Sequence, residues 1–153
     1  MQRKGFTMIE LIFVIVILGI LAAVAIPKLA ATRDDAKISK ALSEVSTLVS
    51  ELGAYYTAHG QFSGTLSDMT NIQDANYTTA FNNGHGVITY YTPDNTGNNE
   101  ACVTFDVNNS GGTLTVARVA NPTGNVCQGL QASSSFSRDL EGTKHFGGSR
   151  VSF

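Results

Sequence analysis

The feature that most constrains this chain is an apolar run near its N-terminus. Residues 11–26 contain no polar side chain, and within residues 8–30 the only charged residues are Glu10 and Lys28. As a helix, this stretch would cross roughly the 30 Å of a bilayer's hydrocarbon core. The run therefore predicts one membrane-spanning helix over residues 6–30.

The residues before the run predict its orientation and its processing. Arg3 and Lys4 precede it, so the N-terminus is expected to stay cytoplasmic and the remainder to be exported. An ordinary signal peptide is cut at a small-residue site behind its apolar segment. Here the change from polar to apolar falls at Gly5-Phe6 instead. A cut there would remove a leader of residues 1–5 and leave the apolar segment as the new N-terminus.

Glu10 is a costly residue at the start of an apolar segment, because a carboxylate near a bilayer loses solvation. One interpretation is a half-solvated acid at the membrane boundary that has no role. The other is a charge partner. After cleavage the nearest cation is the new amine of Phe6, and the geometry favours the amine of a neighbouring subunit. Opposite charges about 4 Å apart attract far more strongly in a low dielectric than in water.

Residues 4–11 (KGFTMIEL) and the apolar run that ends at Pro27 resemble the N-terminus of type IV pilins and type II secretion pseudopilins. The resemblance is close over residues 1–35. It implies an α+β, pilin-like fold. In that fold a long N-terminal helix, membrane-spanning in its first half, packs by its second half on a small antiparallel sheet.

The resemblance also implies how the chain is processed and assembled. A prepilin peptidase would cleave after Gly5 and methylate the amine of Phe6. Glu10 would neutralise the Phe6 amine of an adjacent subunit, while an assembly ATPase and a platform protein extract the subunit from the inner membrane. Gly19 and Pro27 match the ends of the stretch that loses helical bonding in filaments of this family. Proline lacks an N–H and glycine is a weak helix former; a simple kink at Pro27 is the alternative.

Residues 31–56 predict an amphipathic helix, which His59-Gly60 is expected to end. Its apolar residues recur at three- and four-residue steps and so form one stripe. They are Ile38, Ala41, Leu42, Val45, Leu48, Val49, Leu52 and Tyr55-Tyr56. Such a stripe most often packs on its own domain, here a sheet. A coiled coil is the alternative, weakened by the small number of heptads.

Residues 57–153 predict a small extracytoplasmic globular domain. Strands are expected over residues 86–92, 101–107 and 113–119, with a hairpin loop between the last two. Residues 67–84 predict a loop region with one short helix or turn, and the tail from Asn121 is rich in Gly and Ser. The expected sheet is antiparallel, with three or four strands.

Two cysteines, Cys102 and Cys127, lie in this half of the chain. Alternation along residues 101–107 places Val103 and Phe105 on one face of the strand and Cys102 on the other. If this half is exported, the pair is expected to form one disulfide. It would close a loop of about 25 residues and contribute roughly 3–4 kcal/mol in the chain-entropy model. Two reduced thiols are the alternative.

The sequence offers little for catalysis or for binding a cofactor, and we expect neither an enzyme nor a metal site. His59, His85 and His145 lack metal-ligand spacing, and there is no nucleophile elbow, phosphate loop or paired-carboxylate motif. The net charge is −2 with scattered basic residues, so the footprint of a nucleic-acid binder is missing. A basic patch formed by folding stays open as an alternative.

Two polar segments allow weaker hypotheses. Residues 94–100 are rich in oxygen ligands but lack the spacing of a calcium loop, so a polar turn is the preferred interpretation. Residues 74–78 and 106–110 both resemble the extended bacterial N-glycosylation sequon, a short motif that also arises by chance in a chain rich in Asn, Ser and Thr.

The prediction is a structural subunit that polymerises into a type II secretion pseudopilus or a type IV pilus-like filament, acting in protein secretion or DNA uptake. Its expected partners are other copies, other pilins or pseudopilins, the peptidase, the ATPase and the platform protein. It would lie first in the bacterial inner membrane and then in a periplasmic or extracellular filament. The alternative is a membrane-tethered extracytoplasmic binding module that captures DNA or a secreted substrate without polymerising.

Overall fold

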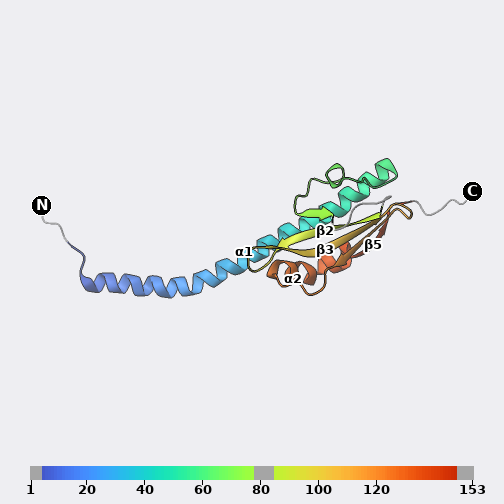
Figure 1. Ribbon diagram of the computed structural model, residues 1–153. Coiled ribbons are helices and arrows are strands. Elements are labelled where there is room, and N and C mark those ends of the chain that lie inside the picture. The colour runs from blue at the N-terminus through green and yellow to red at the C-terminus, as the bar shows by residue number, and fades with distance from the viewer. Residues whose placement is uncertain (1–4, 78–84, 148–153) are drawn as a thin grey trace, which may run out of the picture. The chain divides into compact units, whose positions relative to one another are not determined.

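The computed structural model describes residues 5–77 and 85–147 (Figure 1). Residues 1–4 of the predicted leader and Thr78, the end of the first sequon-like segment, lie outside these residues. The elements are α1 (Met8–His59), η1 (Leu66–Asp68), β1 (Ala75–Tyr77), β2 (His85–Pro93), β3 (Asn99–Asn108), β4 (Thr113–Arg118), α2 (Asn125–Ala132), η2 (Phe136–Leu140) and β5 (Gly142–His145). The chain forms two compact units, Met1–Ala36 and Lys37–Phe153, and α1 contributes to both.

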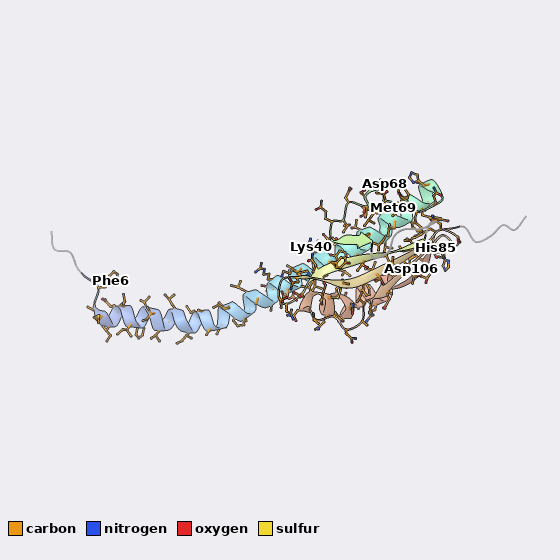
Figure 2. The ribbon with its side chains drawn as sticks, in the orientation of Figure 1. Phe6, Lys40, Asp68, Met69, His85 and Asp106 are labelled. Atoms are coloured by element: carbon orange, nitrogen blue, oxygen red, sulfur yellow. A yellow bond between two sulfur atoms is a disulfide. The ribbon has the colours of Figure 1, made fainter. Side chains whose placement is uncertain are left out.

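The first unit has no core of its own. Every residue from 5 to 33 is exposed, and the side chains of its helix project outward along the ribbon (Figure 2). Large apolar side chains here are between 44% exposed, at Ile17, and 91% exposed, at Phe6. By length and composition the helix is suited to cross a membrane. The described part of the chain therefore leaves the apolar run uncovered, which fits a helix anchored in a membrane.

The second half of α1 buries the predicted apolar stripe. Ala41, Val45, Leu48 and Leu52 are 0–3% exposed and recur four, three and four residues apart, which places them on one face of a helix. The rest of the stripe packs against this core: Ile38, Leu42, Val49, Tyr55 and Tyr56. The helix ends at His59, as expected, because Gly60 takes the left-handed conformation (φ +72°) that glycine adopts without strain.

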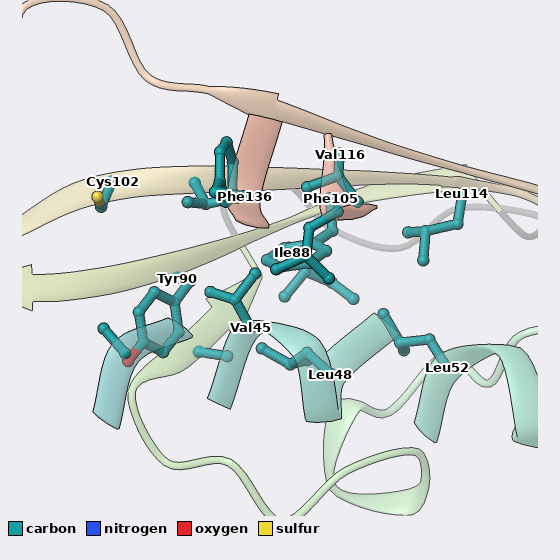
Figure 3. Packing of buried hydrophobic residues seen from close by; sticks show 14 of the residues in the cluster. Val45, Leu48, Leu52, Ile88, Tyr90, Cys102, Phe105, Leu114, Val116 and Phe136 are labelled. Atoms are coloured by element: carbon teal, nitrogen blue, oxygen red, sulfur yellow. The ribbon is translucent and has the colours of Figure 1, made fainter. Parts of the chain in front are cut away.

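The sheet has five antiparallel strands in the order β1-β2-β3-β4-β5. Ile88, Phe105 and Val116 are paired across three neighbouring strands and point at α1, where Val45 and Leu48 meet them (Figure 3). The predicted strands are confirmed, and so is the α+β architecture of a long helix on a small antiparallel sheet. The expected number of strands was too low. The additional strands, β1 and β5, are edge strands of three and four residues, too short to show an alternating pattern.

A β-bulge corrects the predicted position of Cys102. Tyr90 pairs with Val103 and Tyr91 with Ala101, so Cys102 is an extra residue on β3 that has no partner on β2. Such a bulge turns two successive side chains toward one face. Cys102 is therefore 0% exposed beside Val103 in the core, and not on the opposite face as simple alternation predicts.

The Gly- and Ser-rich tail is more ordered than its composition suggests. It forms α2, which buries Val126, Cys127 and Leu130 against the rest of the unit. A side chain added at Gly129 would overlap Ile38 of α1. The glycine in the middle of α2 thus leaves room for the Ile38 side chain of α1, although composition alone favours a loop.

Candidate functional site

The predicted cleavage position lies in accessible, non-helical backbone. Gly5, Phe6 and Thr7 precede the first residue of α1, Met8, and all three are exposed. Apart from its two chain neighbours, no described residue has an atom within 4 Å of a side chain added at Gly5. A protease must bind an extended peptide, so the Gly5–Phe6 bond is sterically available where a bond inside the helix would not be.

Glu10 is held by Thr7 in a reciprocal capping box. The backbone N–H and the hydroxyl of Thr7 donate to Glu10 Oε2 at 2.8 and 2.7 Å, and the backbone N–H of Glu10 approaches Thr7 Oγ1 at 3.3 Å. This is the Thr-x-x-Glu arrangement that satisfies free N–H groups at a helix start. Sequence reasoning missed the role of Thr7, although the Thr-x-x-Glu spacing was there to find it. The second carboxylate oxygen, Oε1, has no hydrogen bond to any residue that the structure describes.

Gly19 and Pro27 lie inside a continuous helix. Apart from its chain neighbours and the backbone of its own helix, no atom of the described chain lies within 4 Å of a side chain added at Gly19. Pro27 removes the N–H that would bond the carbonyl of Ala23, yet α1 continues through it. The free subunit therefore has no interrupted segment here. The proposed loss of helical bonding between these positions belongs to the assembled state and stays a prediction.

Cys102 and Cys127 form a disulfide, which confirms the predicted pair. Both residues are 0% exposed, and the bond ties the bulge in β3 to α2. Gln131, one turn after Cys127, donates through Nε2 to the carbonyls of Cys102 and Val119 at 2.9 and 3.0 Å. The disulfide and Gln131 together hold α2 on the sheet.

A cluster of charged and polar side chains joins α1 to the strands. Lys40 Nζ lies 3.2 Å from Glu44 and 3.1 Å from Asp74, and the Tyr90 hydroxyl donates to Glu44 Oε2 at 2.5 Å. Burial, and then the bond to Glu44, raise the pKa of Tyr90 far above its ordinary value. The bonds to Asp74 and Glu44 raise the pKa of Lys40. Lys40 is therefore already neutralised within the subunit.

The oxygen-rich segment between β2 and β3 is a turn closed by its own hydrogen bonds. The Asp94 carboxylate accepts from the hydroxyl of Thr96 and from the backbone of Thr96 and Asn98, and these bonds lower its pKa. Burial acts to raise the pKa of Glu100, but bonds from Thr123 and Gly124 lower it overall. Both carboxylates are satisfied by donors from the chain, as the polar-turn interpretation requires.

The remaining candidates do not converge on a site. His59 stacks on Tyr55, His85 lies 3.4 Å from the hydroxyl of Ser110, and His145 is exposed on β5. Among residues 5–77 and 85–147, no three His, Cys, Asp or Glu side chains are placed to hold a metal ion. In the second sequon, Asn108 Oδ1 accepts from the backbone of Ser110 at 2.8 Å, which closes a local turn at the end of β3.

Comparison with known proteins supports the N-terminal assignment. Residues 1–26 match the profile of the prokaryotic N-terminal methylation motif. The chain is 41% identical over 54 residues to the type II secretion system core protein G of Pseudomonas aeruginosa, which covers 35% of this chain and 38% of that protein. It is 35% identical over 103 residues to a fimbrial protein of Neisseria meningitidis, covering 64% of this chain and 60% of that protein.

The matched regions span 35–41% of the length of the first type II secretion relatives. No solved structure matches the chain. The motif and the two kinds of relative confirm the resemblance to type IV pilins and type II secretion pseudopilins that residues 4–11 and the following run predict.

Proposed function

We propose that this chain is a structural subunit that polymerises through its N-terminal helix into a type II secretion pseudopilus or a type IV pilus-like filament. The observation that carries the proposal is the first unit itself. Its residues 5–33 are exposed and residues 11–26 are apolar, and a single ordered carboxylate, Glu10, precedes the apolar run. Such a helix would be surrounded by lipid before assembly and by the N-terminal helices of other subunits after it.

The energetics explain why one carboxylate matters. Moving an apolar helix from lipid into a bundle gains little hydrophobic free energy, because lipid tails are as apolar as leucine. A carboxylate at the membrane, in contrast, is costly there and gains from any partner that neutralises it. Glu10 is thus the group in this segment whose free energy favours the filament over the bilayer. The work of extraction would fall to an assembly ATPase and a platform protein of the inner membrane.

The capping box suits Glu10 to this role. A prepilin peptidase that cuts after Gly5 and methylates the Phe6 amine leaves Thr7 in the mature subunit, so the bonds that orient the carboxylate survive cleavage. Glu10 Oε2 receives both Thr7 donors, which leaves Oε1 for an incoming cation. The amine of Phe6 on an adjacent copy is the cation that cleavage creates.

The test separates the charge of Glu10 from its capping function. Glu10→Gln keeps an oxygen that can accept from Thr7 but has no charge, whereas Glu10→Val removes both. We expect both variants to insert in the membrane and to be cut to a mature chain that begins at Phe6, and neither to form sheared filaments. Glu10→Asp, which keeps the charge, should retain part of the assembly. N-terminal sequencing and electron microscopy of sheared material provide the readouts.

Filaments at the normal level with Glu10→Gln would contradict charge pairing and leave capping as the role of Glu10. Filaments absent from the wild type, in cells that have the whole export machinery, would favour the membrane-tethered binding module instead. In that case the apolar helix would be an anchor alone.

A further inference from the structure

Glu51 on α1 is an acid that has no charged partner among the residues that the structure describes. Its Oε2 is buried and has no hydrogen bond, and none of the described residues forms an ion pair with it. It lines a cavity of about 250 Å³ together with Tyr55, Asp68, Thr70 and Asn71, and no cationic residue is among the lining side chains. Asp68 accepts from the neutral Ser63 hydroxyl at 2.7 Å, so no cationic side chain of the cavity lining balances either carboxylate. The cavity is a place where an outside cation would be stabilised.

Lys37 on the same helix is the complementary case. It is half-buried and lines a cavity of about 320 Å³ that also contains Lys40, Asp74, Tyr91 and Asn99. Lys40 is paired with Glu44 and Asp74. Lys37 has neither a hydrogen bond nor an ion pair within the described part of the chain. Its ammonium group is therefore free for an acid that the subunit does not supply.

Lys37 and Glu51 lie on one side of the second unit. Lys37 and Glu51 are fourteen residues apart on α1, which is about 3.9 helical turns and about 21 Å. They therefore lie on nearly the same side of the helix. η1 and the segment that leads from it to β1 border both cavities, with Ser67–Asn71 beside Glu51 and Asp74 beside Lys37. The distance is too great for a pair within one subunit.

A second copy of the same chain, displaced along α1, would supply each of the two charges with an opposite charge. If a second subunit is shifted along α1 by about this spacing, its Lys37 comes level with Glu51 of the first. Such a head-to-tail contact joins two different patches, does not close on itself, and repeats indefinitely, as a filament requires. The shift differs from the four-residue offset between Phe6 and Glu10, so the two contacts involve different neighbours.

We propose that Lys37 of one subunit docks against Glu51 of a second copy of this chain, as an intersubunit ion pair outside the apolar core of the filament. This rests on the proposed function, because it requires a filament. It adds to that function a contact in the globular region that sets the axial register between subunits.

The test is a charge swap with matched controls. Lys37→Glu and Glu51→Lys each place like charges against each other, and each should reduce sheared filaments at least about tenfold. The double variant restores opposite charges and should recover filaments to within about threefold of the wild type. Arg138→Glu and Asp106→Lys make the same reversals at exposed positions elsewhere on the unit, and they should assemble normally. Normal assembly of both single variants, or a double variant no better than either, would overturn the proposal.

Cross-linking gives a readout that does not depend on the swap. In assembled filaments of a Lys37→Cys, Glu51→Cys variant, a short bismaleimide should produce a covalent ladder. Bridging within one subunit is prevented by the separation of about 21 Å, and the native cysteines are already bonded to each other. Either single cysteine variant should give no ladder. Filaments of the double cysteine variant without a ladder would refute this contact and leave the proposed function standing, whereas absence of wild-type filaments would refute the proposed function itself.

Discussion

Replacing Tyr90 by Phe should destabilise the globular unit by a definite amount. Tyr90 is 2% exposed, and its hydroxyl donates to Glu44 at 2.5 Å. A hydrogen bond to a charged group contributes about 1.5–3 kcal/mol net. Glu44 keeps Lys40 at 3.2 Å and its side chain is 22% exposed, so water and Lys40 partly replace the lost donor. We therefore expect the lower end, about 1.5 kcal/mol, or roughly 6 °C in the Tm of a unit this size.

The measurement is calorimetric unfolding of the full chain in a mild detergent, with Tyr91→Phe as the control. Tyr91 is the next residue of β2 and is half-buried, and its hydroxyl has no hydrogen bond in the part of the chain that the structure describes. Tyr91→Phe should leave the Tm unchanged. Equal Tm values for the two variants would refute the reasoning, because the hydroxyl bonded to Glu44 would then be contributing nothing.

A comparison of the wild type with Tyr90→Phe also tests how stability depends on pH. The pKa of Tyr90 is raised in the folded state, so folding favours the neutral phenol. Its contribution is complete below the unfolded pKa of about 10 and is lost as the pH rises toward the folded value. The wild type should therefore lose more stability above pH 10 than Tyr90→Phe does. Lys40, whose pKa is also raised, is present in both proteins and cancels in the comparison.

Two further variants test the attachment of α2. Replacing both Cys102 and Cys127 by Ala should lower the free energy of unfolding by about 3.5 kcal/mol in the chain-entropy model, measured by denaturant titration; a loss below about 1 kcal/mol would show that the loop is already constrained without the bond. Gly129→Ala should destabilise by about 1 kcal/mol because the added methyl group overlaps Ile38, although alanine is the better helix former. Combination with Ile38→Ala should remove most of the penalty specific to Gly129→Ala, and a raised Tm for Gly129→Ala alone would contradict the close packing of the two helices.

The long helix, its apolar stripe and the three longer strands could all be predicted from the sequence, because each is long enough for its hydrophobic period to show. A strand of three residues such as β1, or of four such as β5, shows no period. The helix α2 in the tail could not be predicted for a different reason. Gly129 lies against Ile38, and this contact joins residues far apart in the sequence.

The candidate site divides in the same way. Gly5, Phe6 and Glu10 were identified from their positions at the edge of an apolar run, a purely local pattern. The role of Thr7 is just as local, because its Thr-x-x-Glu spacing from Glu10 is the pattern of a capping box. Lys37 and Glu51 could not be singled out from sequence, because only a folded arrangement shows which charges have partners among the described residues.

The two units also determine how mutational results can be interpreted. Residues 5–33 are exposed throughout, so a substitution at Glu10 or Gly19 removes no contact from the core of the second unit. A loss of filaments from such a variant, with the Tm unchanged, must arise in the membrane or between copies. Lys37 and Glu51, in contrast, are half-buried in the unit that carries the core, and a loss of filaments there can arise from misfolding. For that reason recovery in the charge-swapped double variant carries more weight than loss in either single variant, since a second reversal cannot repair a fold that the first had broken unless the two positions meet.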